Sequence, residues 1–130
     1  MGKIKYLLDS VAAIDLFNAV PGSELLEEKL EGAAVYVSVI TRIEMLAFPK
    51  MTPAGEKEVS RFLRWIKVIP LNRKVEQNSI LVRRTKKLKL PDTIIAATAL
   101  TVGATVISRD GSMLKLNWPG LPVEHSPVTV

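Results

Sequence analysis

Residues 88–110, LKLPDTIIAATALTVGATVISRD, predict a buried helix that leads into a buried strand. Pro91 has the fixed φ that suits the first position of a helix, and Gly103 supplies the stop. Between them the chain is nearly apolar on every side, which is typical of a helix enclosed in a core. Asp92 opens this helix. Because an unpaired charge is costly to bury, the carboxylate needs either a partner or a function.

Short, solidly apolar runs alternate with helical segments along the rest of the chain. Such runs suit parallel strands covered on both faces, and the alternation predicts an α/β fold. We therefore expect one domain over residues 1–130, a three-layer α/β/α sandwich around a mostly parallel sheet. The expected strands are 4–8, 34–39, 67–70, 105–107 and 122–124, and the expected helices are 11–20, 23–31, 41–48, 54–66, 73–88 and 92–103.

The composition excludes several classes of site. The chain has no cysteine, which rules out a disulfide framework, a thiolate metal site and a cysteine nucleophile. No apolar run reaches the roughly 20 residues of a membrane-spanning helix, and Asp9 interrupts the apolar stretch that a signal peptide would need. We expect a cytoplasmic protein with no membrane partner. Its net charge of +5 favours a polyanionic partner such as nucleic acid.

Four acidic residues are expected at one edge of the sheet. In open α/β sheets, sites form beyond the carboxyl ends of the strands. Asp9 ends the first strand, Asp110 follows strand 105–107, and Asp92 opens the helix before that strand. Glu44 lies about one turn into the helix after the second strand.

Each acid also has an ordinary structural explanation. Asp92 suits the positive end of a helix dipole, and Asp9 and Asp110 suit the caps of helices or turns. Thr41 and Glu44 have the spacing of a capping box, in which each side chain satisfies the other's backbone donor. For any one acid, this structural explanation stays open beside a functional one.

The convergence of all four acids favours a shared metal ion. Like charges repel, so a cluster of carboxylates is kept where a hard cation neutralises it. An all-oxygen ligand set suits Mg²⁺ or Mn²⁺ rather than zinc. We therefore predict that one such ion is held by Asp9, Glu44, Asp92 and Asp110.

Four segments resemble the PIN-domain ribonucleases, and in particular the VapC toxins of VapBC toxin–antitoxin pairs. The resemblance covers nearly the whole chain, and the order and spacing of the segments add to its specificity. The segments are YLLDSVAAIDLFN (6–18), VSVITRIEMLAF (37–48), LKLPDTIIAATALTVGATVISRD (88–110) and PGLPVEH (119–125).

The resemblance implies a Mg²⁺- or Mn²⁺-dependent endoribonuclease. Asp9 and Asp92 match the surest metal ligands of the family, Glu44 and Asp110 match its other acids, and Ser108 stands where a small hydroxyl residue is usual. As a toxin the protein would act on RNA, form a homodimer and bind a cognate antitoxin that blocks the acidic cleft.

Two positions depart from the family pattern. The family often has asparagine two positions after the first aspartate, where this chain has Val11, so a group that orients the carboxylate is absent. Such a loss typically costs about 10- to 100-fold in metal affinity or activity. The second departure follows Asp110, where a further acid and an aromatic are usual and this chain has Gly111-Ser112-Met113.

A basic run, VRRTKKLK (82–89), precedes Asp92. We expect Arg83, Arg84 and Lys87 to bind RNA phosphates, with Ser108 assisting, although a solvated helix face would look the same. Trp65 is expected to pack in the core with its apolar neighbours.

Three alternatives stay open on the sequence. The first is a catalytically weakened PIN-like module that binds RNA or protein, and the second is a PIN ribonuclease that is not a toxin. The third is another acidic α/β domain, such as a phosphoacceptor receiver, for which the residues after Asp9 and after strand 105–107 fit poorly.

Overall fold

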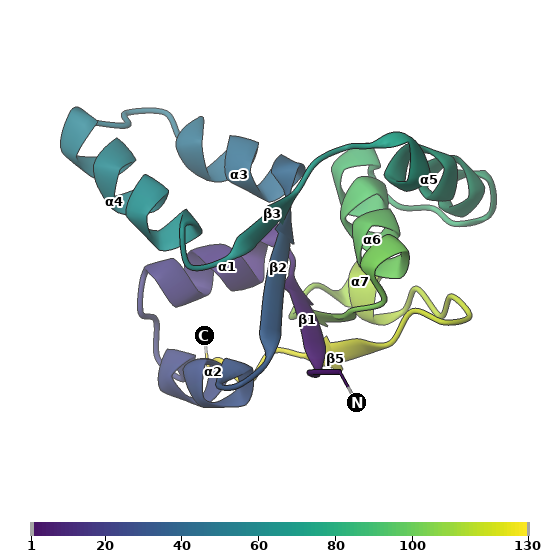
Figure 1. Ribbon diagram of the computed structural model, residues 1–130, viewed down its shortest axis with the longest axis horizontal. Helices are drawn as coiled ribbons and strands as arrows, with labels where there is room; N and C mark the ends of the chain where they lie inside the picture. The colour runs from purple at the N-terminus through teal and green to yellow at the C-terminus, as the bar shows by residue number, and fades with distance from the viewer. Residues whose placement is uncertain (1, 130) are drawn as a thin grey trace.

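A five-stranded parallel sheet forms the middle layer of the protein, in the order β3-β2-β1-β4-β5 (Figure 1). The computed structural model describes residues 2–129. Leu7 of β1 lies in register between Tyr36 of β2 and Val106 of β4. The expected mostly parallel sheet is confirmed, and each of its strand pairs is parallel. The strands are β1 (Lys5–Leu8), β2 (Ala34–Ser38), β3 (Lys67–Ile69), β4 (Thr105–Ser108) and β5 (Val123–His125).

Helices cover both faces of this sheet. Figure 1 shows α1, α2 and α4 on one side and α5, α6 and α7 on the other. The predicted three-layer α/β/α sandwich is therefore confirmed. Within residues 2–129 the helices are α1 (Ser10–Phe17), α2 (Ser23–Leu30), α3 (Val39–Leu46), α4 (Pro53–Leu63), α5 (Arg73–Thr85), α6 (Leu90–Val102) and α7 (Gly111–Leu114). None of these helices is long and apolar enough to cross a membrane.

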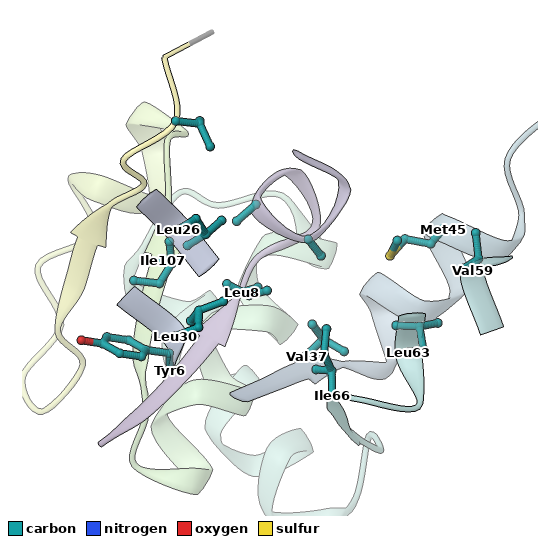
Figure 2. Packing of buried hydrophobic residues seen from close by; sticks show 13 residues of the cluster. Tyr6, Leu8, Leu26, Leu30, Val37, Met45, Val59, Leu63, Ile66 and Ile107 are labelled. Atoms are coloured by element: carbon teal, nitrogen blue, oxygen red, sulfur yellow. The ribbon is translucent and has the colours of Figure 1, made fainter. Parts of the chain in front are cut away.

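The central strand β1 divides the core because successive side chains of a strand point to opposite faces. Tyr6 and Leu8 enter a cluster that also contains Leu26 and residues of α1, α3 and α4 (Figure 2). Leu7 enters a second cluster with Ile95 of α6. Each fully buried leucine contributes about 1.5–3 kcal/mol, so the position of the end of β1 is strongly fixed from both sides.

Helix α6 is the buried helix that the sequence predicts. Its N-cap is Lys89 and it begins at Leu90, two residues before the predicted start at 92, so Pro91 and Asp92 occupy its second and third positions. Gly103 ends it with a φ of +74°, a conformation that glycine adopts without strain. Residues 95–99 of this helix are all buried. The result is a rigid support with one acidic residue in its first turn.

Three local expectations differ from the structure. The predicted helix 73–88 ends at Thr85, so the second half of the basic run lies in a loop. A short helix, α7, occupies 111–114, where none was predicted. Trp65 is not in the core: it follows the end of α4 and is 85% exposed, so the expectation that it packs is wrong.

Candidate functional site

The strand order reverses between β1 and β4, and the candidate site lies at this point. From β1 the chain proceeds to β2 and β3 on one side, and then returns to β4 and β5 on the other. Ligands of open α/β sheets bind in the crevice that opens at such a reversal. Asp9 follows β1 directly, and its backbone N–H donates to the carbonyl of Ile107 over 3.2 Å. Ser108 ends β4 beside it.

Asp9 is both a helix cap and a buried acid. Its Oδ1 accepts a 2.8 Å hydrogen bond from the N–H of Ala12, which confirms the capping explanation. The residue is only 4% exposed. Burial raises the pKa of this carboxyl group above 3.8, the Ser108 hydroxyl and the Ala12 amide oppose the rise, and the charges of Asp110 and Asp92 add to it. Asp9 is therefore held in a place that penalises its charge.

Glu44 does not cap a helix, so the capping-box explanation is wrong. Helix α3 begins at Val39, and its cap is Ser38, whose Oγ accepts from the N–H of Ile40 over 3.0 Å. Because this start comes earlier than predicted, Thr41 lies inside the helix and is fully buried. The carboxylate of Glu44 is consequently available to groups outside its own helix.

A chain of two hydroxyl groups holds Glu44 in place. Ser10 Oγ donates to Glu44 Oε1 over 2.8 Å and lies 3.0 Å from Thr41 Oγ1. Since one hydroxyl has one proton and the carboxylate accepts it, Thr41 must donate to Ser10. The side chain next to Asp9 thus fixes an acid from the neighbouring helix. Neither hydroxyl was expected in this role from the sequence, although Ser10 directly follows Asp9.

Asp92 extends from the start of α6 toward the same region. It is half-buried, and burial raises the pKa of its carboxyl group above 3.8. The charges of Asp110 and Glu44 raise this pKa further, while Lys89 lowers it. These effects place Asp92 within electrostatic range of acids from two other elements.

Asp110 and Ser108 close the other side of the site. Asp110 Oδ2 accepts from the N–H of Met113 over 3.3 Å, so Asp110 caps α7, as its capping explanation expected. Ser108 is fully buried, and its Oγ accepts from the backbone N–H of Asp110 over 2.9 Å. The structure therefore places Ser108 beneath the acids rather than at a surface that RNA could contact.

The four acids have no ion-pair partner within residues 2–129. The ion pairs within residues 2–129 join Lys29 to Glu124 and Arg109 to Asp15, so none of the four acids takes part in one. The same residues contain no group of three His, Asp or Glu side chains placed closely enough to hold a metal ion by themselves. Mg²⁺ commonly keeps several waters and takes only one or two carboxylates directly, so the donor set fits this ion in that mode.

An ion pair beside the cluster was not predicted. Arg109 Nε donates to Asp15 Oδ2 over 2.8 Å, and Nη2 donates to Oδ1 over 3.3 Å. Asp15 is only 5% exposed, and its hydrogen bonds raise the pKa of Arg109 above its ordinary value. Arg109 lies between Ser108 and Asp110, so this pair fixes the loop that carries Asp110. An acid inside the apolar helix 11–20 was a signal for Asp15, but its partner is 94 positions away.

Three of the predicted RNA-binding residues lie at the end of α5 and in the loop that follows it. Arg83, Arg84 and Lys87 are all exposed. Arg83 donates through Nη1 to the carbonyl of Leu88, so its guanidinium also holds the loop that leads to α6.

The two departures from the family pattern fall at exposed positions. Val11 is 38% exposed in the first turn of α1, so no polar side chain is supplied there. Ser112 is exposed on α7.

Comparisons with known proteins agree with this fold. A sequence model of the PIN domain matches residues 6–119. A solved toxin–antitoxin complex from Klebsiella pneumoniae is similar to this chain at 28% identity and a TM-score of 0.76, over 96% of this chain and 99% of that one. VapBC2 from Rickettsia felis, bound to a promoter DNA fragment, has 18% identity and a TM-score of 0.79, over 94% and 98% of the two chains. DNA-bound VapBC from Salmonella typhimurium has 19% identity and a TM-score of 0.74, over 94% and 98%. Among curated proteins, none matches the sequence.

Proposed function

This chain belongs to the PIN-domain family, and from that premise we propose that it is a metal-dependent endoribonuclease and the toxin of a toxin–antitoxin pair. PIN domains are generally nucleases. The observation that carries the proposal is the gathering of four acids at the reversal of the sheet, where the charge of Asp110 raises the pKa of both Asp9 and Asp92 and neither of these two has an ion pair. A divalent cation is the partner that would offset this repulsion.

In this proposal the side chains of the site place a Mg²⁺ or Mn²⁺ ion and the scissile phosphate. Asp9 and Asp92 would hold the cation directly, and Glu44 would orient a water that completes its shell. Ser108 supports Asp9 and Asp110 from beneath, which is the role we assign it. When bound, the cation would lower the pKa of a water nucleophile and neutralise charge on the phosphate.

The experiment is cleavage of single-stranded RNA by the purified protein, with Mg²⁺, with Mn²⁺ and with EDTA. We expect metal-dependent cleavage that falls at least 100-fold in Asp9→Asn and Asp92→Asn. Glu56→Gln, an exposed acid on α4, is the matched control and should leave the rate unchanged. Cleavage that persists in EDTA, or in both aspartate variants, would refute the proposed chemistry.

The RNA phosphates would lie over the exposed end of α5, on Arg84 and Lys87, with Arg83 contributing charge. Such contacts release counterions, so binding should weaken steeply as salt is added. Salt-independent binding would exclude this role.

An apolar groove beside Glu44 supports the antitoxin partner. The groove has a volume of about 320 Å³ and lies between α1, α3 and α4. Phe48, at its wall, is 65% exposed, and Glu44 lines the same groove. An antitoxin segment with an apolar face and one basic residue would fill the groove and neutralise Glu44, which would block the site. The Klebsiella pneumoniae complex is itself a toxin–antitoxin complex.

A second apolar groove supports a homodimer. It lies between α5 and α6, has a volume of about 350 Å³, and includes Leu71, Ile80 and Leu90, each about half exposed. Burying these side chains against a second copy would remove them from water. Light scattering should report a dimer that Ile80→Asp converts to a monomer.

Val11 favours a second candidate, a weakened PIN module that binds RNA without useful turnover. The same cleavage assay separates the two, because Val11→Asn should then raise the rate by about 10- to 100-fold. A PIN ribonuclease without an antitoxin would instead cleave RNA and bind no partner in its groove.

A further inference from the structure

Trp65 is the most exposed large apolar residue of the chain that the structure describes, at 85%. It lies in the turn after α4, and together with Arg61 and Arg64 it lines a hollow of about 320 Å³. We refer to these three residues as the Trp65 patch. An indole left in water forgoes the stabilisation that burial gives, and its exposure leaves a large flat apolar face available to a ligand.

The sequence of α4 explains why Trp65 faces outward. The inner side of the helix is complete without it: Val59 and Leu63 are buried, and Phe62 packs edge-to-face on Phe17 at 5.4 Å. The helix ends at Leu63, and Trp65 comes after the helical periodicity has stopped. Its side chain therefore has no position on the inner face.

The charged residues that flank Trp65 in the sequence are basic. From Val59 to Val75 the chain has no acidic residue, and its basic residues are Arg61, Arg64, Lys67, Arg73 and Lys74. Neither arginine of the patch belongs to the ion pairs found among residues 2–129. Two guanidinium groups that line a hollow with a bare aromatic ring match a polyanion that also carries flat rings.

We propose that the Trp65 patch binds single-stranded RNA outside the carboxylate cluster. A base would stack on the indole of Trp65, and the adjacent phosphates would accept hydrogen bonds from Arg61 and Arg64. The proposal rests on the proposed ribonuclease function, since RNA is the substrate there. The patch would then act as a holding site for the strand that the acids cut.

Helix α4 runs from the groove that contains Glu44 to the Trp65 patch. Its first turn contributes Gly55 to the groove that also contains Glu44, and its last turn reaches the Trp65 patch. The 11 residues of α4 span about 16 Å at 1.5 Å per residue, a length that a few nucleotides of extended strand can cover. Figure 1 shows α4 at the outer edge of its layer, away from α5, so the strand would approach over a different surface from the basic end of α5.

A membrane surface fits the patch less well. Insertion into a lipid interface needs an apolar face of several residues, whereas the side chains that line the hollow with Trp65 are both arginines. Two arginines beside an exposed indole favour the stacking of a base and contact with its phosphates.

The test measures RNA binding in the Asp9→Asn protein, so that binding is read without cleavage. A single-stranded oligoribonucleotide should quench tryptophan fluorescence, and the quench should persist in Trp118→Phe. Trp65→Ala should weaken binding about 5- to 100-fold. Arg61→Ala/Arg64→Ala should reduce the slope of log affinity against log salt by about 1.4, at about 0.7 per phosphate contact.

Lys3→Ala/Lys115→Ala removes the same charge elsewhere and should keep the slope. Exposed substitutions of this kind usually change stability by less than about 0.5 kcal/mol, so all variants should fold. Unchanged affinity in both patch variants would overturn the proposal, and so would patch-dependent binding to anionic vesicles without binding to RNA. If the parent protein fails to cleave RNA while the patch still binds it, the ribonuclease proposal fails and the patch stands.

Discussion

Ser10 Oγ donates a 2.8 Å hydrogen bond to Glu44 Oε1, which joins two acids of the site through the residue that follows Asp9. Glu44 is exposed, and this bond is the contact that orients it. The orientation of an acid that supports a bound metal typically matters about 10- to 100-fold.

We therefore expect Ser10→Ala to lower kcat, or the affinity for Mg²⁺, by about 10- to 100-fold with little change in KM for RNA. Thr41→Val removes only the outer hydroxyl and should have a smaller effect in the same direction. Steady-state cleavage over a range of Mg²⁺ concentrations measures kcat and the affinity for Mg²⁺ in both variants. An unaltered metal dependence in Ser10→Ala would show that this bond does not position Glu44.

Asp9→Asn should stabilise the protein at neutral pH in EDTA. Burial raises the pKa of Asp9 above 3.8, so the folded protein binds more protons than the unfolded chain as the pH rises from that value. Stability therefore falls with rising pH through the folded-state pKa and then levels off. Asparagine keeps the cap of α1 and cannot ionise.

Thermal melts of both proteins between pH 3 and 8 test this prediction. The advantage of Asp9→Asn should be largest near neutral pH and should vanish below about 3.8. Added Mg²⁺ should raise the melting temperature of the parent and so reduce the difference in melting temperature between Asp9→Asn and the parent. A variant that melts lower than the parent throughout this range would mean that the site imposes no charge penalty.

Arg109→Ala should destabilise the fold and also lower activity. It leaves the Asp15 carboxylate, 5% exposed, without the partner that donates both of its hydrogen bonds. It also releases the loop that presents Asp110. Because the double substitution leaves no unpaired buried charge, Asp15→Asn/Arg109→Ala should melt above Arg109→Ala. Differential scanning fluorimetry gives the order, and a double variant that melts lowest would contradict it.

Two substitutions of Asp110 should separate its structural role, as the cap of α7, from its proposed role in cleavage. Asp110→Asn keeps an oxygen for the N–H of Met113, so stability should change little while cleavage is lost. Asp110→Ala removes the cap as well and should cost about 1 kcal/mol in addition. Equal activity in the Asn variant and the parent would remove Asp110 from the site and leave it as a cap alone.

The sequence predicts the fold well because the information is local. The apolar helix before the strand at 105–107 and the solid apolar runs are enough to define the layers, and the structure confirms them. Helix starts are less certain: Ser38, Thr41 and Glu44 all suit a first turn, and only the structure shows that Ser38 provides the cap.

The rest of the site depends on contacts between distant positions. The partner of Asp15 is 94 positions away, and that of Glu44 is 34 positions away, so neither spacing is visible in a local pattern. The prediction that Trp65 packs in the core was wrong for a related reason. Its apolar neighbours suggested a longer helix, but the inner face of α4 is already filled by Val59 and Leu63.

Asp9 and Asp110 cap helices through an oxygen that asparagine also has. A single base change converts an aspartate codon to an asparagine codon, so the chain can be disarmed while its shape survives. In a cell that suffers from the activity, selection would then favour full-length, well-folded and inactive descendants over truncated ones. If the proposed toxin function holds, such silenced copies would be expected to accumulate wherever the proposed antitoxin is lost.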